Sequence, residues 1–83
     1  MTDKQTDRIE SMKRLMSDMF REEWHRPEYS IAASRNTPDA HAAMIIAGLS
    51  NGTASKGGPI VKRCLAALGI KPTYKAIKEW LNG

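Results

Sequence analysis

The sequence is poor in cysteine, in aromatic residues and in long apolar runs. Its one cysteine, Cys64, cannot form an internal disulfide, so we expect a reducing, cytoplasmic location. No apolar run approaches the ~18 residues needed to span a bilayer. The first residues, Met1 to Lys4, lack the apolar segment of a secretory signal. The sequence therefore predicts neither a membrane protein nor a secreted one.

Groups that carry enzyme chemistry are also sparse. The imidazole and thiol side chains lie on three separate segments, without the spacing of metal ligands: His25, His41 and Cys64. Cys64 falls on an apolar helix face, where a small buried hydrophobe is its usual role. The glycine-rich stretch 50–58 lacks the Lys-Ser/Thr pair of a phosphate-binding loop. We therefore expect no enzyme activity, no metal and no cofactor.

The chain length and composition predict one small domain over residues 1–83. With 83 residues, the chain is too short for a second independent core. Hydrophobic residues make up 41% and charged residues 27%, which is typical of a folded rather than a disordered chain. A chain of this size buries only about 60–65% of its unfolded surface, so we expect modest stability.

Residues 3–25 predict one amphipathic helix. Its apolar residues recur at helical spacing and form a single stripe: Ile9, Met12, Leu15, Met16, Met19, Phe20 and Trp24. Thr2 and Gln5 have the spacing of a capping box at its start. Pro27 ends it, because proline disfavours helical backbone in the preceding residue. The stripe predicts packing against the rest of the domain. The alternative is a docking surface or dimer seam made by Met12, Met16, Met19 and Phe20.

The middle of the chain predicts a connection and a second helix. Residues 27–36 are expected to form the connection, with Tyr29 and Ile31 turned into the core. Thr37 is a candidate N-cap, followed by Pro38 at the first helical position. The helix that begins there, over residues 38–49, is almost entirely small or aliphatic, which predicts a central and buried element.

Two short helices follow the glycine-rich stretch. Pro59 begins the first and Gly69 is placed to end it. Thr73 is a candidate N-cap for the second, over residues 74–81. Ile77, Trp80 and Leu81 are expected on its buried side. Together these elements predict an all-α, four-helix domain. The three helices over 38–81 form a compact tri-helical unit, and the helix over 3–25 either covers its open apolar side or pairs with a second copy.

Charge is unevenly distributed along the chain. The net charge is +4 overall, but residues 1–53 carry −1 and residues 54–83 carry +5. The basic residues of the second part are Lys56, Lys62, Arg63, Lys71, Lys75 and Lys78, against Glu79 alone. Such an excess suits a polyanionic partner. The alternative is a solvated surface that keeps the protein in solution.

The segment over residues 59–81 carries a recognisable pattern. Cys64 and Leu68 are expected to turn inward before Gly69, and Ile70 follows that glycine directly. This pattern resembles the helix-turn-helix of bacterial and phage DNA-binding proteins, in which the glycine permits a sharp turn and the next aliphatic residue anchors it. The resemblance covers about the last quarter of the chain, and it predicts a helix-turn-helix-like hairpin within the tri-helical unit.

The segment departs from the helix-turn-helix pattern at two points. Leu65 stands where the family usually has a small residue. The apolar residues of the second helix, Ile77 and Trp80, come about two places later than the family pattern puts them. Either the turn is longer than usual and contains Pro72, or the motif is a variant of the helix-turn-helix.

The resemblance implies a small transcription regulator of bacterial or phage type, with double-stranded DNA as its partner. Its second helix would enter the major groove. The residues it places at base edges and flanking phosphates are Lys71, Thr73, Tyr74, Lys75 and Lys78. Those expected along the DNA backbone are Lys56, Lys62 and Arg63. A homodimer paired through the N-terminal helix would double these contacts on adjacent half-sites.

Two other kinds of partner fit the same sequence. One is another protein, on which a small phage-type inhibitor or adaptor docks through the methionine-rich stripe or the basic face. The other is structured RNA, although the chain has few aromatic residues to stack on single strands. The sequence does not indicate a cognate site or a biological process.

Overall fold

The computed structural model describes residues 3–83, and the regular structure in this range is helical. In chain order the elements are α1 (Asp3–Glu23), the 3₁₀ helix η1 (Pro27–Tyr29), α2 (Ser30–Arg35), α3 (Pro38–Asn51), α4 (Pro59–Ala67) and α5 (Tyr74–Leu81). The all-α class is therefore confirmed. The described residues contain five α-helices and one 3₁₀ helix, where the sequence predicted four helices. Thr2, and with it the predicted capping box, lies outside the described residues.

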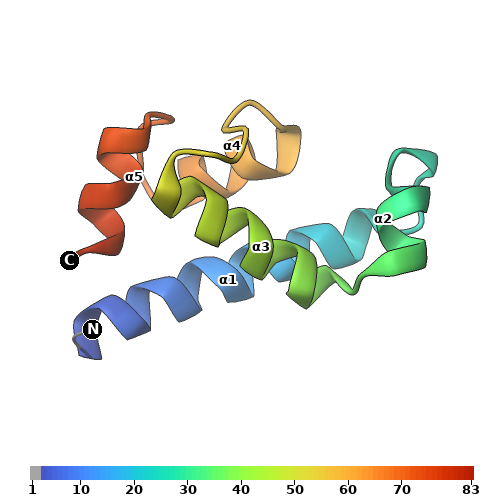
Figure 1. Ribbon diagram of the computed structural model, residues 1–83, viewed down its shortest axis with the longest axis horizontal. Helices are drawn as coiled ribbons and strands as arrows, with labels where there is room; N and C mark the ends of the chain where they lie inside the picture. Colours follow the sequence, from blue (N-terminus) through green and yellow to red (C-terminus); the bar gives the residue numbers. More distant parts are fainter. Residues whose placement is uncertain (1–2) are drawn as a thin grey trace.

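Helix α1 is the longest element and runs along one side of the molecule (Figure 1). Its predicted stripe faces inward, with Met12, Met16 and Phe20 buried. The helix ends at Glu23, two residues earlier than predicted. It cannot continue to Pro27, because the residue before that proline takes an extended backbone with φ −73° and ψ 149°.

The predicted connection over residues 27–36 is instead folded into η1 and α2. Tyr29 packs on the core as expected, with its ring centroid 5.8 Å from that of Phe20 and 5.9 Å from that of Trp24. Ile31 does not enter the core, since its side chain is 71% exposed. The helical backbone explains this difference. In an α-helix, side chains two residues apart point about 200° apart around the axis, so Ile31 points away from the side that Tyr29 occupies.

Helix α3 begins as predicted. The Thr37 hydroxyl oxygen accepts a hydrogen bond from the Ala40 N–H at 3.1 Å, and Pro38 occupies the first turn. The helix extends two residues beyond the predicted end and is closed by Gly52, which has a φ of 73°. Only one side of it is buried, and Met44 on the other side is 62% exposed. The expectation of a fully buried helix is therefore wrong, because the other described helices cover a single face.

The turn between α4 and α5 follows the geometry that its glycine allows. Gly69 has a φ of 71°, its N–H bonds to the Ala66 carbonyl at 3.1 Å, and the Ile70 N–H bonds to the Leu65 carbonyl at 2.9 Å. This pair of bonds is a Schellman motif, and Ile70 is buried beneath it. Helix α5 then begins where predicted, because the Thr73 hydroxyl oxygen caps it by accepting from the Ala76 N–H at 3.1 Å.

One core joins α1 to the three later helices. Its buried residues come from α1, α3, α4, α5 and the turn before α5: Met12, Met16, Phe20, Ala42, Ile46, Leu49, Ile60, Val61, Cys64, Leu65, Ile70, Ile77 and Leu81. Helix α5 lies at the end of the molecule near the start of α1 (Figure 1). There the Arg8 side chain donates to the Trp80 carbonyl at 2.8 Å and covers the Trp80 ring at 5.3 Å. Trp80, expected in the core, is only partly buried.

Candidate nucleic-acid interface

The exposed side of α5 carries two of the predicted contact residues. Ile77 and Leu81 occupy the buried side of this helix, which leaves Lys75 and Lys78 on the opposite, solvent-exposed side together with Glu79. Lys71 is exposed in the turn just before the helix. These three lysines therefore precede or lie on one short helix, and none of them forms an ion pair within residues 3–83.

Thr73 and Tyr74 are partly committed to contacts inside the chain. The Thr73 hydroxyl oxygen accepts the capping hydrogen bond of α5, so only its hydrogen remains free to donate to a phosphate. The Tyr74 hydroxyl donates to the Ala54 carbonyl at 2.6 Å, which turns the phenol toward the loop over residues 52–58. A tyrosine at a helix start can also pack against a neighbouring segment, and Tyr74 does so here; its contact with a DNA groove stays a prediction, for which its hydroxyl hydrogen is already used.

Tyr74 instead brings the loop and α5 together. The Lys56 ammonium lies over the Tyr74 ring, 4.4 Å from its centroid, which is a cation–π distance. The loop is also fixed at its beginning, because the Thr53 and Ala54 N–H groups both bond to the Gly48 carbonyl, at 2.8 and 3.1 Å. The start of α5 therefore carries a lysine from this loop in addition to the lysines of its own segment.

The close fit of this loop explains why residue 48 is a glycine. A Cβ atom built at Gly48 would lie only 2.6 Å from the Ala54 Cβ atom, a distance that real Cβ atoms do not tolerate. Glycine therefore allows the loop backbone to approach α3 closely. This close approach sets the position of the Ala54 carbonyl, which accepts the hydrogen bond from the Tyr74 hydroxyl.

Helix α4 carries the other two predicted contacts, and one of them, Arg63, is set apart from the last turn of α5. Lys62 and Arg63 are both exposed on the outer side of α4. The Arg63 guanidinium points toward Glu23 at the end of α1, with 3.9 Å between Nη1 and Oε1. Trp80, by contrast, contacts Arg8 near the start of α1. These two points on α1 are separated by about 22 Å along its axis, so Arg63 lies far from the last turn of α5.

The two halves of the chain differ in how their charges are compensated. Three cations of α1 and the turn after it are paired with carboxylates: Lys13 with Glu10 at 3.4 Å, Arg21 with Asp18 at 2.7 Å and with Asp39 at 2.8 Å, and Arg26 with Glu23. Among the six basic residues of 54–83, only Arg63 has a carboxylate within 4 Å in the described part of the chain. The lysines of this region therefore have no direct ion-pair partner in the described range, as is also true of Lys4, Arg8, Arg14 and Arg35 in the first part of the chain.

The methionine-rich stripe of α1 is not a surface in this fold. Met12 and Met16 are completely buried and Phe20 is nearly so, while Met19 is partly buried against the same core. The structure instead gives these four side chains the role of core packing. A partner or a second copy could reach Met12, Met16 and Phe20 only if the fold opened, because α3 and α4 cover this face of α1, whereas Met19 keeps part of its surface exposed.

The side chains with metal-binding or nucleophilic chemistry are dispersed. Within residues 3–83, no three His, Cys, Asp or Glu side chains lie close enough to hold one metal ion. Cys64 is buried, and this burial raises the pKa of its thiol to about 11. His41 packs edge-on against Phe20 with 4.8 Å between ring centroids, and burial lowers its pKa below 6.5. Both groups are therefore neutral at neutral pH.

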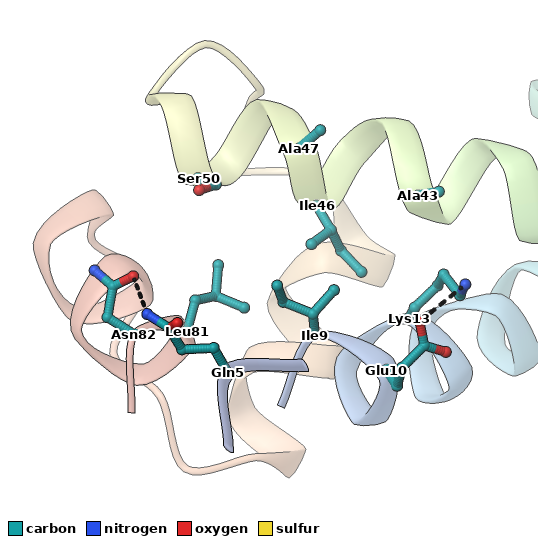
Figure 2. Close-up of a pocket in the computed structure, with 10 residues that line it drawn as sticks. All are labelled: Gln5, Ile9, Glu10, Lys13, Ala43, Ile46, Ala47, Ser50, Leu81 and Asn82. Carbon is teal, nitrogen blue, oxygen red and sulfur yellow. Dashed lines mark hydrogen bonds and ion pairs between the residues drawn. The ribbon is translucent and has the colours of Figure 1, made fainter. Parts of the chain in front are cut away.

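An apolar groove between α1, α3 and α5 is a second surface feature, which the sequence did not predict. Figure 2 shows Ile9, Ile46 and Leu81 directed into the space between the three helices. The groove has a volume of about 580 Å³, and Ala43 and Ala47 form its wall on α3. The i, i+4 spacing of these alanines was a visible signal. It could not show whether a neighbouring helix fills the space beside them.

Known proteins give no guide to the role of either surface. The comparison finds no matching family model, no matching curated protein and no matching solved structure. Among the described helices, none has both the length and the apolar character needed to cross a bilayer. Any role for the two surfaces therefore rests on the placement and chemistry of their own side chains.

Proposed function

We propose that this protein binds double-stranded DNA through α5 and the turn before it, as a small regulator of bacterial or phage type. The observation that supports the proposal best is the charge of five lysines that have no carboxylate within 4 Å among residues 3–83: Lys56, Lys62, Lys71, Lys75 and Lys78. Cations without carboxylate partners are free to exchange their counterions for phosphates.

The order of elements is also consistent with the helix-turn-helix resemblance. Helix α4 ends in a glycine turn, Ile70 anchors that turn in the core, and α5 follows with an exposed lysine face. In the proposed complex the start of α5 lies in the major groove, where Lys75 donates to acceptors on base edges. Lys71 and Lys78 contact the flanking phosphates, which fixes the position of the helix but carries no sequence information.

The structure modifies the proposed role of Tyr74. Its hydroxyl and ring hold the loop over residues 52–58, so we assign it to the positioning of Lys56 rather than to a base contact. Arg63 is assigned a lesser role, because Glu23 partly neutralises it. Lys62, on the same helix and without such a partner in the described range, remains a candidate backbone contact.

The test measures the affinity of the protein for labelled random duplex DNA by fluorescence anisotropy at two salt concentrations. If about five lysines neutralise phosphates, the slope of log K against log salt is about −4.5, and affinity falls by about 500-fold between 50 and 200 mM salt. Lys75→Glu with Lys78→Glu should abolish binding at both concentrations. Both side chains are exposed, so the fold should survive, which circular dichroism checks.

The matched control is Arg26→Glu with Arg35→Glu, which changes the net charge by the same amount. Both side chains are exposed; Arg26 precedes η1 and Arg35 is the last residue of α2, at the opposite end of the molecule from α5 (Figure 1). Because Arg26 pairs with Glu23, circular dichroism also checks the fold of this variant. We expect this variant to lose much less affinity than the α5 variant. Equal losses would refute a localised interface, and absence of binding by the unmodified protein at 50 mM salt would refute the proposal. Tighter binding to an RNA duplex than to DNA would refute the choice of DNA.

A further inference from the structure

We propose that the groove between α1, α3 and α5, together with the exposed side of α3, is the surface on which a second copy of this chain docks. The inference does not rest on DNA binding. Figure 2 shows the groove walls formed by Ile9, Ile46 and Leu81. At one end the Gln5 amide donates to the Asn82 side-chain carbonyl at 3.4 Å, and along α1 the rim is the Lys13–Glu10 ion pair.

The exposed side of α3 beside this groove is uncharged and mostly small. It consists of Ala40, Ala43, Met44, Ala47, Ser50 and Asn51, which all lie on the side of the helix away from the core. Alanine side chains let two helix axes approach closely. Met44, which is 62% exposed, lies on this side next in sequence to Ala43 of the groove wall, and its sulfur accepts a hydrogen bond from the Asn36 side-chain amide at 3.6 Å.

An exposed apolar side chain beside an apolar hollow suits a two-fold interface, in which one surface must be complementary to itself. In such an interface each copy uses the same surface. Met44 of one copy can therefore enter the groove of the other, while the groove of the first copy receives the partner's Met44. Methionine suits this role because its unbranched side chain adapts to an irregular hollow. Each copy would therefore contribute both the inserted Met44 side chain and the groove that accepts it.

The charges around the groove favour a second copy over a partner of one strong charge. The neighbouring hollow on α1 and α3 is lined by three carboxylates and three cations: Glu10, Asp18, Asp39, Lys13, Arg14 and Arg21. The formal charges of this neighbouring hollow sum to zero, although the molecule carries a net charge of +4. Two identical copies repel each other least through their neutral face, and the mixed rim gives each carboxylate an opposite charge to meet.

The proposed dimer surface and the basic surface use different residues. Helix α5 contributes only Leu81 and the following Asn82 to the groove, while its lysines lie on the other, exposed side. Standard interfaces cover roughly 800 Å² on each partner, a modest part of the 5267 Å² surface of this chain. We expect a reversible dimer with a dissociation constant of about 1–100 µM.

The experiment is sedimentation velocity of the full chain from about 1 µM to about 1 mM, a range that brackets the expected affinity. The unmodified protein should shift from monomer to dimer across this series. Ala47→Glu places a charge on the groove wall at an exposed helical position, where glutamate is nearly as good a helix former as alanine. It should weaken the dimer by at least tenfold while circular dichroism shows unchanged helix content.

Ala66→Glu is the matched control, since it makes the same substitution on the exposed side of α4, outside the groove. It should dimerise like the unmodified protein. A protein that stays monomeric at the highest concentration overturns the proposal and leaves the groove to a different occupant. An Ala47→Glu variant that dimerises normally, or an Ala66→Glu variant that is equally weakened, also overturns it.

Discussion

Replacement of Tyr74 by phenylalanine tests the contact that connects α5 to the loop over residues 52–58. The substitution keeps the ring beneath Lys56 and removes only the hydroxyl, which donates to the Ala54 carbonyl at 2.6 Å in a partly buried setting. A hydrogen bond of this kind contributes about 0.5–1.5 kcal/mol net, and its loss leaves the carbonyl without this partner. For a chain of this length, a loss of 1 kcal/mol lowers the melting temperature by roughly 4–8 °C.

The assay is thermal unfolding followed by circular dichroism, with Tyr29→Phe as the matched control. Tyr29 is also partly buried and packed between aromatic rings, but its hydroxyl has no hydrogen-bond partner among the described residues. The control should therefore change stability by less than about 0.5 kcal/mol. Hydrogen exchange should also become faster at the amides of 53–58 in Tyr74→Phe only. Equal melting temperatures for the two variants, with unchanged exchange in the loop, would refute the assigned role.

Two further predictions concern the titratable groups in the core. Burial lowers the pKa of His41 in the folded chain below its unfolded value of 6.5, so its contribution to stability is complete above about pH 7 and is lost as the pH falls below 6.5. Urea unfolding at about pH 7.5 and about pH 5.5 should show this loss, and His41→Phe should reduce it. Burial raises the pKa of Cys64 to about 11, so its thiol should react with a disulfide reagent at about pH 8 only in denaturant. Rapid reaction of the native protein would contradict its burial.

The sequence was sufficient to locate most helix ends. Thr37 and Thr73 cap α3 and α5, and Gly69 closes α4, as their local patterns predicted. These features are predictable because each depends on hydrogen bonds between residues at most five positions apart. Pro27 limits how far α1 can extend, through the backbone of Arg26, but the helix ends at Glu23, two residues before the predicted end.

The sequence was less informative about which apolar residues face solvent. Ile31 was expected in the core and is exposed, and α3 was expected to be buried all round but covers the core with one side only. The methionine stripe of α1 left two interpretations open, packing or docking, because its helical spacing is the same in both. The choice depended on the presence of α3 and α4 against that stripe.

The two candidate surfaces also depend partly on the sequence and partly on the tertiary structure. The excess of lysine after residue 54 is a property of the sequence, and so is the small or aliphatic character of the predicted helix over residues 38–49. Only the tertiary structure placed the Tyr74 hydroxyl on Ala54, directed Arg63 to Glu23 and left a groove beside Ala43. Caps and helix periods arise from neighbours along the chain, whereas burial and grooves arise from segments brought together across it, at distances that no local pattern encodes.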